Sequence, residues 1–144
     1  MRTGIAILLI LLAMPAWADD SAIGFVKTLT GHVTVTRAGV VRPVELAMPL
    51  YVQDRLITAT DGQLGITFRD NTRISLGPDS QVDLPNFVFK PAERQYGFVL
   101  RLAFGTMQYL SGLTAKLAPD AMSIETPTAT IAVRGTHFLV RAEK

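Results

Sequence analysis

The stretch "QLGITFRDNTRISLGPDSQVDLPNFVFK", residues 63–90, decides the fold class. It opens with Leu64, Ile66 and Phe68, which are separated by single small or polar residues. Apolar residues at every second position are typical of a strand with one buried face. Further pairs with this spacing follow at Ile74 and Leu76, Val82 and Leu84, and Phe87 and Phe89. With turns at roughly eight-residue intervals, this rhythm predicts an all-β architecture.

The segments between these runs carry residues that favour turns. Asp70, Asn71 and Thr72 lie between the first two runs. An Asp in a turn accepts hydrogen bonds from nearby backbone N–H groups, and an Asn tolerates left-handed geometry. The pair Pro85-Asn86 predicts a further turn, which would separate the last two apolar pairs into independent strands. The stretch would then hold four short strands.

The second half of the chain predicts longer strands. In "YGFVLRLAFG", residues 96–105, apolar and aromatic residues alternate until Gly105 interrupts the pattern. Residues 111–121 show no clear period and predict a loop or a single helical turn. The many short strands favour a small β-solenoid stack, with a β-sandwich as the alternative.

The N-terminal segment "MRTGIAILLILLAMPAWA", residues 1–18, predicts a secretory signal peptide that is cleaved before Asp19. It has a basic start at Arg2, an apolar run and a small-x-small pair at its end. The run is shorter than the roughly 20 residues that a membrane helix needs, so an uncleaved anchor is the less favoured alternative. The sequence therefore predicts a single periplasmic domain over residues 19–144 that does not span the membrane.

Composition argues against several classes of function. Arg2 is the only charged residue of the predicted signal, so the 14 Lys and Arg residues become 13 in the mature chain, against 12 Asp and Glu. The basic residues are scattered, whereas nucleic-acid binding requires a clustered basic surface. The chain contains no Cys, so thiol catalysis and a disulfide framework are excluded.

Motifs for catalysis and for metal binding are missing from the sequence. His32 and His137 lie far apart in the chain, and neither belongs to a ligand motif. The several Asp residues in turns are better explained as turn-forming groups than as a catalytic pair. Phosphate-loop and Gly-x-Ser-x-Gly patterns do not occur. We therefore expect no enzyme activity, no catalytic residue, no metal ligand and no cofactor.

The stretch "TPTATIAVRGTHFLV", which begins at Thr126, is β-prone but interrupted twice. Pro127 cannot donate to a strand ladder and holds Thr126 in extended geometry. Gly135, between Arg134 and Thr136, permits a backbone conformation that a side chain resists. Arg134 at this bend is a structural clasp for the last hairpin, a contact to a partner or a residue that recognises a ligand. We expect Gly135→Val to lower the melting temperature.

This closing stretch resembles the signature of the FecR domain, in which a Thr-Pro-x-Ala lead-in precedes Val-Arg-Gly-Thr-x-Phe-x-Val. The matching positions are Thr126, Pro127, Ala129, Val133, Arg134, Gly135, Thr136, Phe138 and Val140. Upstream, the chain is similar to the first half of the domain at Asp54, Thr58, Asp70, Thr72, Leu76 and Ser80. Gln53 and Asn71 stand where the family tends to have Gly, and the likeness covers about residues 31–140.

The resemblance implies binding rather than catalysis. FecR-type proteins are transmembrane regulators of iron-uptake signalling, and the domain also occurs in stand-alone exported proteins, which this chain resembles. It implies a structural signature that is also a candidate partner contact, formed by Arg134, Gly135, Thr136, Thr126 and Pro127. It also implies structural turns at Asp54, Asp70, Asn71 and Thr72.

The expected partner is an envelope protein, either a sensor or an outer-membrane protein, which the domain would meet through surface complementarity or strand addition. One alternative is a binder of small molecules or glycans, for which Phe25, Tyr51 and Tyr109 are the candidate exposed aromatic residues. A structural envelope protein without a dedicated ligand is the other alternative.

Overall fold

The computed structural model describes residues 21–134 and 136–144, so the predicted signal peptide and Gly135 lie outside the described residues. The described chain is built almost entirely of strands, which confirms the predicted all-β class. The strands are β1 (Gly24–Thr30), β2 (Val33–Arg37), β3 (Val40–Pro43), β4 (Pro49–Leu50), β5 (Arg55–Thr58), β6 (Gln63–Phe68), β7 (Arg73–Leu76), β8 (Gln81–Lys90), β9 (Gln95–Leu110), β10 (Met122–Glu125), β11 (Thr130–Ala132) and β12 (His137–Ala142). The helical elements are η1 (Pro91–Glu93), α1 (Leu113–Leu117) and η2 (Pro119–Ala121).

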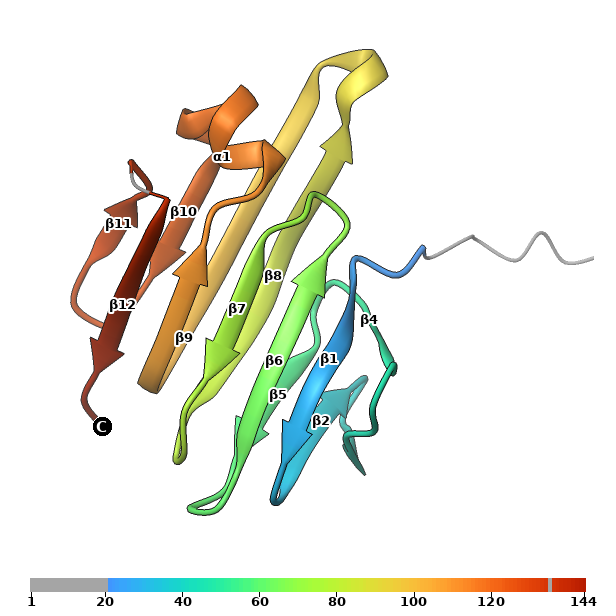
Figure 1. Cartoon of the computed structure of the whole chain (residues 1–144), viewed down its shortest axis with the longest axis vertical. Coiled ribbons are helices and arrows are strands. Elements are labelled where there is room, and N and C mark those ends of the chain that lie inside the picture. Colours follow the sequence, from blue (N-terminus) through green and yellow to red (C-terminus); the bar gives the residue numbers. More distant parts are fainter. Residues whose placement is uncertain (1–20, 135) are drawn as a thin grey trace, which may run out of the picture.

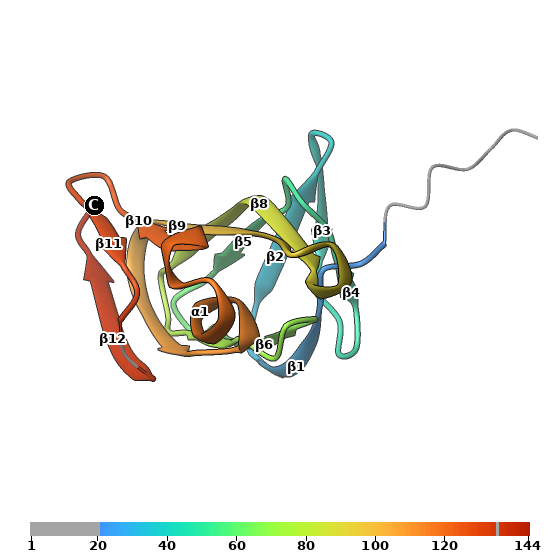
Figure 2. The same ribbon diagram turned by 90° about the horizontal axis from the view of Figure 1, so that it is seen from above.

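The strands form one curled sheet in the order β3-β2-β5-β8-β9-β7-β6-β1-β4 (Figure 1). β10 and β12 also pair with β9, and β11 pairs with β10. In the described part of the chain, the pairing of β10 with β9 is parallel and the other pairings are antiparallel. Seen from above, the sheet bends around a common interior (Figure 2). The choice between a solenoid and a sandwich stays a prediction.

β9 joins the two halves of the curled sheet. Its first part pairs with β8 and β10, and its second part pairs with β7 and β12. The change occurs at Gly105, whose φ is +98°, where the sequence predicted an interruption. The buried side chains lie at even positions before it, as at Phe98, and at odd positions after it, as at Met107. This bend lets one strand contribute to both walls of the core (Figure 1).

The core fills the space inside the curl. Phe98 packs edge-on against Phe68 and Phe87, with 4.8 Å between ring centroids in both pairs. Phe68, Phe87 and Phe98 come from β6, β8 and β9, so the cluster joins both halves of the sheet. Fully burying such a side chain contributes about 1.5–3 kcal/mol. The predicted inward residues of the first repeats are confirmed as buried, namely Leu64, Ile66, Phe68, Ile74, Leu76, Val82, Leu84 and Phe87.

The predicted turn at Pro85-Asn86 is wrong, because β8 runs through it. The register of β8 against β9 jumps between Asp83 and Asn86, which marks a β-bulge. Leu84 donates its N–H to the Asp54 carbonyl and accepts the Gln53 N–H on its own carbonyl. At a bulge the missing N–H of Pro85 leaves no gap in the ladder. The bulge residues therefore bond to the β4–β5 turn instead of to β9.

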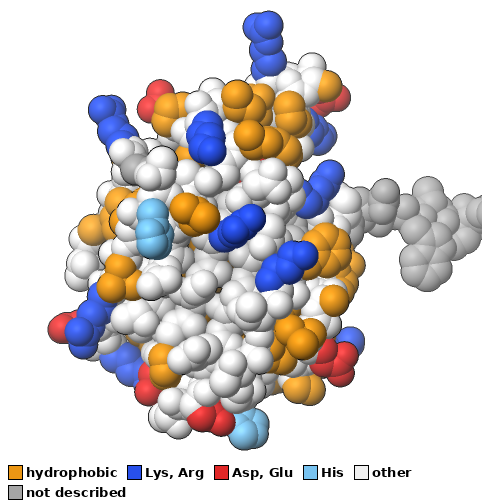
Figure 3. Space-filling view, in the orientation of Figure 1, with side chains coloured by type: hydrophobic (Ala, Val, Ile, Leu, Met, Phe, Trp, Pro, Cys, Tyr) orange, Lys and Arg blue, Asp and Glu red, His pale blue; other side chains and the backbone are white. Residues whose placement is uncertain are grey.

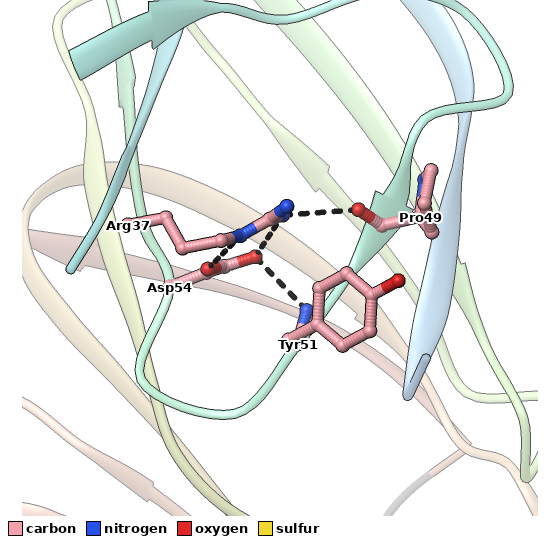
Figure 4. A network of polar contacts seen from close by, with 4 residues as sticks. All are labelled: Arg37, Pro49, Tyr51 and Asp54. Carbon is pink, nitrogen blue, oxygen red and sulfur yellow. Dashed lines mark hydrogen bonds and ion pairs between the residues drawn. The ribbon is translucent and has the colours of Figure 1, made fainter. Parts of the chain in front are cut away.

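The β4–β5 turn is held by Asp54, which is buried (Figure 4). Its carboxylate accepts hydrogen bonds from Nε and Nη2 of Arg37, at 2.8 and 2.7 Å, and from the Tyr51 N–H at 2.9 Å. The Arg37 guanidinium also lies over the Tyr51 ring, 4.6 Å from its centroid. Gln53 in this turn has φ +74°, a conformation that favours Gly and explains the Gly of the family pattern.

The β6–β7 turn is held by Asp70, which is fully buried. Its carboxylate accepts hydrogen bonds from the Thr72 N–H at 3.0 Å, the Thr72 hydroxyl at 2.8 Å and the Thr114 N–H at 3.3 Å. Asn71 takes the left-handed conformation, with φ +66°, which Asn tolerates better than most residues. Because Thr114 belongs to α1, the turn also anchors this helix to the end of the sheet.

Polar residues of the matched sequence pattern account for most of the buried polar side chains. The buried polar residues in the described chain are Asp54, Thr58, Asp70, Thr72, Ser80 and Thr114. The Thr58 hydroxyl donates to the Gly77 carbonyl at 2.7 Å and accepts the Ser80 N–H at 2.9 Å. These side chains replace backbone partners where the chain leaves one strand for the next. The polar residues of the pattern therefore hold the turns in their conformations.

We expect the buried phenol of Tyr109 to make unfolding depend on alkaline pH. Burial raises its pKa above the ordinary value of a tyrosine, so the unfolded chain loses this proton at a lower pH than the folded chain. The resulting stability is fully present below about pH 10 and is lost as the pH rises through the folded pKa. Denaturant unfolding from pH 8 to 11 tests this. Tyr109→Phe should flatten the alkaline decline, and an unchanged slope would contradict the assignment.

Candidate partner-binding site

The sheet offers four terminal strands in the described chain, namely β3, β4, β11 and β12. Native proteins commonly protect such edges with short strands and with Pro. β3 has four residues and ends in Pro43, and β4 has two residues and begins with Pro49. β11 has three residues. β12 is the longest of the four, with six residues and no Pro, so it offers the most extensive edge for strand addition.

The free edge of β12 can be assigned residue by residue. The Ser111 N–H donates to the Thr136 carbonyl at 2.8 Å, and this pair continues the register in which Phe138 lies opposite Tyr109. Hydrogen-bonded pairs alternate along an antiparallel ladder. The backbone groups of Phe138 and Val140 therefore point to β9. Those of His137, Leu139 and Arg141, named here as the open-edge residues, point away from it.

The pairing of β9 on its other side supports this assignment. There the Gly77 N–H donates to the Thr106 carbonyl at 3.1 Å, which makes the even-numbered residues of this part of β9 the partners of β7. The odd-numbered residues are then free to bond β12. The side chains of the open-edge residues are exposed, and Leu139 has 63% of its surface accessible. This strand therefore combines unpaired backbone groups with an exposed apolar side chain.

A hollow of about 450 Å³ lies at the start of β12, and we call it the signature pocket. Its lining residues are Ser111, Ala115, Lys116, Pro119, Asp120, Val133, Arg134 and Thr136. Arg134 and Thr136 come from the sequence signature, and the opposite wall comes from α1 and η2. Arg134 is exposed, and in the described residues its side chain makes no hydrogen bond or ion pair. Two of the predicted contact residues, Arg134 and Thr136, thus lie beside the start of β12.

Two further signature residues, Thr126 and Pro127, lie elsewhere on the same flank of the molecule, by which we mean the side formed by β10, β11 and β12. Thr126 and Pro127 form the turn between β10 and β11. The Thr126 N–H donates to the Ala129 carbonyl at 2.8 Å, and the Thr126 hydroxyl accepts the Ala129 N–H at 3.1 Å. These bonds close the β10–β11 hairpin, while neither residue lines the signature pocket. The structure therefore brings together Arg134 and Thr136 but not the whole predicted set.

Basic residues slightly outnumber acidic residues around β12. The hollows at the two ends of β12 are lined by the basic residues Lys116, Arg134, Arg141 and Lys144 and by the acidic residues Asp79, Asp120 and Glu143. No ion pair involves any of them in residues 21–134 and 136–144. Figure 3 shows basic side chains along the margin of the molecule where β12 lies. Elsewhere, acidic groups such as Asp54 and Asp83 are paired with Arg.

A second hollow, of about 630 Å³, lies near the point where the described chain begins. Tyr51, Phe87 and Phe89 contribute aromatic surface to it, and Arg69 and Lys90 contribute positive charge. Of the three aromatic residues predicted for ligand binding, Tyr51 lies here. Phe25 is 44% exposed but does not line this hollow. The prediction for Tyr109 is wrong, because its side chain is buried beneath β12, 4.9 Å from the Phe138 ring.

The histidines occupy surface positions. His32 is exposed, and its Nδ1 lies 2.7 Å from Oδ2 of Asp61. Hydrogen bonding to His32 lowers the pKa of Asp61. His137 is an exposed residue of β12. Within the described ranges, no group of three or more His, Asp or Glu residues is arranged to hold a metal ion.

Sequence reasoning missed two features of this flank. The open edge depends on which residues of β9 face β7 and which face β12, and no local pattern in the sequence specifies that choice. The signature pocket depends on α1, which the irregular segment 111–121 only suggested as a helical turn. The sequence did contain one indication of the open edge. The residues that form β12 include no Pro, whereas β3 and β4 each contain one.

Comparisons with known proteins bear on most of the chain. The family model described as "FecR protein" matches residues 54–144, which is more than half of the 144 residues. No curated protein matches the chain. A solved "Cell surface anchoring domain" is 36% identical to it, with 44% of this chain and 84% of that chain covered and a TM-score of 0.42. Among the described helices, none has the length and apolar character to cross a bilayer.

Proposed function

Because the chain belongs to the FecR family, we propose that it is an exported, non-enzymatic, protein-binding module that acts in envelope signalling or assembly through a separate membrane protein. The FecR family is a signalling family, which supports an envelope-associated role. Residues 1–18 are the signal peptide in this proposal, and residues 19–144 are the periplasmic domain. The partner is a sensor or an outer-membrane protein.

One observation carries the proposal, the open edge of β12. A partner segment in extended conformation pairs with the backbone of His137, Leu139 and Arg141, and so adds a strand beside β12. Main-chain hydrogen bonds then supply affinity, and contacts with side chains on alternate positions supply specificity. Leu139, with most of its surface exposed, provides the apolar contact at the centre of this edge.

Site-specific photocrosslinking in living cells tests this function. A photoreactive amino acid replaces Leu139 on β12 in one variant and Val41 on β3 in the matched control. Both side chains are 63% exposed, so they sample the surroundings equally. We expect one dominant protein adduct from position 139 and none from position 41. The reason is that Pro43 removes a donor from the free edge of β3.

Two outcomes would contradict the proposal. Equal adducts from both positions would mean that exposure, and not the open edge, determines the contact. The absence of any adduct from position 139, with the protein folded and exported, would argue against docking along β12. Identification of the adduct by mass spectrometry then distinguishes a sensor from an outer-membrane protein.

The second hollow favours an alternative function, binding of a small molecule or glycan. Its volume lies within the range of about 300–1,000 Å³ that is common for ligand pockets, and it contains three aromatic side chains. Saturation-transfer NMR with a panel of envelope sugars would detect such binding. Phe89→Ala removes one aromatic wall of the hollow and serves as the control, because Phe89 is only partly buried.

A further inference from the structure

The signature pocket adjoins the start of β12 and ends one residue before the first open-edge residue. Thr136 and Ser111 both line the pocket, and the hydrogen bond between their backbones precedes the first pair of the β12–β9 ladder. His137, the next residue, is the first open-edge residue. A strand that pairs with the open edge and continues one or two residues beyond His137 therefore ends beside Thr136 and Arg134, two of the residues that line the pocket. This relation rests on the proposed function, because it presupposes a partner strand at β12.

The pocket has the chemistry of a carboxylate site. Lys116 and Arg134 bring two cations to its rim, against the single carboxylate of Asp120. Neither cation has an ion-pair partner in the part of the chain that the structure describes. Val133 and Pro119 give the lining an apolar character. Both cations are exposed, and hydrogen bonds from such charged donors to a carboxylate are about twice as strong as those between neutral groups.

The other end of β12 lacks this selectivity. The hollow there, of about 510 Å³, is lined by Asp79, Arg141, Glu143 and Lys144 among others. Two acidic groups balance two basic groups, so this end offers no net preference for either charge. The Lys144 ammonium also lies 4.7 Å from the centroid of the Phe104 ring. This difference in charge between the two ends of β12 distinguishes the two directions in which a partner strand could pair with the edge.

We propose that the partner segment carries a carboxylate immediately after its pairing strand, and that the signature pocket binds this carboxylate through Lys116 and Arg134. Antiparallel pairs outnumber parallel ones roughly two- to three-fold, so the partner strand runs opposite to β12. Its C-terminal end then lies at the start of β12, beside the pocket. The pocket thus recognises an acidic side chain or a C-terminal carboxylate at the C-terminal end of the partner's pairing strand.

Three labelled peptides test the proposal against the purified exported protein. Each has a core of alternating Val and Thr residues. The first ends in two Asp residues, the second ends in two Asn residues, and the third carries the two Asp residues at its N-terminal end; all three are amidated. We expect the first to bind about tenfold more tightly than the second, as one charge-assisted contact of about 1.4 kcal/mol predicts. The third should bind no better than the second.

Matched charge variants locate the effect. The double variant Lys116→Gln, Arg134→Gln should bind the first and second peptides with about equal affinity, and its affinity for the second peptide should be unchanged. Lys27→Gln with Arg42→Gln removes the same charge from exposed positions of β1 and β3 and should leave the preference intact. Loss of the preference in both double variants would show a diffuse charge effect and overturn the pocket assignment.

The remaining outcomes separate this inference from the proposed function. Equal binding of the first and second peptides to the unaltered protein would overturn the carboxylate site and leave strand addition standing. Equal binding of the first and third peptides would overturn the assigned direction. If none of the peptides binds, strand addition itself fails, and the inference fails with it.

Discussion

Gly105→Ala is expected to lower the free energy of unfolding by about 3–5 kcal/mol, because it combines backbone strain with a steric clash. Gly105 has φ +98°, which L-residues rarely adopt. A Cβ at this position would also meet the hydroxyl and the Cα of Ser80. The Ser80 hydroxyl accepts the Thr106 N–H at 3.0 Å, so it cannot move without breaking a bond at the bend of β9.

Denaturant unfolding measures this loss, and Gly39→Ala is its matched control. Gly39 also has a positive φ, +77°, but a methyl group added there would meet no atom within 4 Å beyond its own chain neighbours. The control therefore isolates the strain, which costs about 1 kcal/mol. A similar loss in the two variants would contradict the role of the Ser80 contact. Gly105 would then be required for its conformation alone.

Asp54→Ala is expected to cost about 3–5 kcal/mol, the range for removing one partner of a buried ion pair. The change leaves the Arg37 guanidinium and the Tyr51 N–H without their acceptor (Figure 4). The hydrogen bond to Asp54 raises the pKa of Arg37. Arg37 stays charged even without this partner, because a guanidinium is not deprotonated under the conditions in which proteins fold. Because the Arg37 side chain is 33% exposed, water limits the loss to the lower part of this range.

The control for Asp54→Ala is Asp83→Ala, which breaks the ion pair with Arg55. The Arg55 side chain is 52% exposed and the Asp83 side chain 17%. Surface pairs of this kind contribute about 0–1 kcal/mol. Thermal unfolding of both variants should show a much larger fall in melting temperature for Asp54→Ala. Equal falls would mean that burial does not decide the strength of these pairs.

The periodicity of the sequence predicted the strands because each strand buries one face. Leu64 and Ile66, for example, alternate in the sequence and are both buried in β6. Pro85 misled the prediction, because a Pro in a bulge and a Pro in a turn look alike in sequence. The two differ in long-range partners, here the bonds from Gln53 to Leu84 and Pro85.

The candidate site was predicted in part. Arg134 and Thr136 were found through a motif, and the structure places both at one pocket. Their neighbour Lys116 was not singled out, because its position depends on a five-residue helix whose ends have no side-chain cap. The unpaired backbone groups of Leu139 could not be predicted from the sequence either. It follows from the register between β9 and β12, which is a property of strands that are distant in sequence.

The placement of Pro43 and Pro49 in the edge strands β3 and β4 bears on stoichiometry. Repeated edge-to-edge growth requires that each molecule both offers and accepts a strand. In the proposed function, one side of the sheet accepts a strand at β12, while the edge strands of the opposite side, β3 and β4, contain Pro. Copies of this chain are therefore poorly suited to repeated edge-to-edge growth, because such growth would also have to use β3 or β4. We expect that a domain which takes up one partner strand at β12, as proposed above, ends a strand array and does not extend it into a fibre.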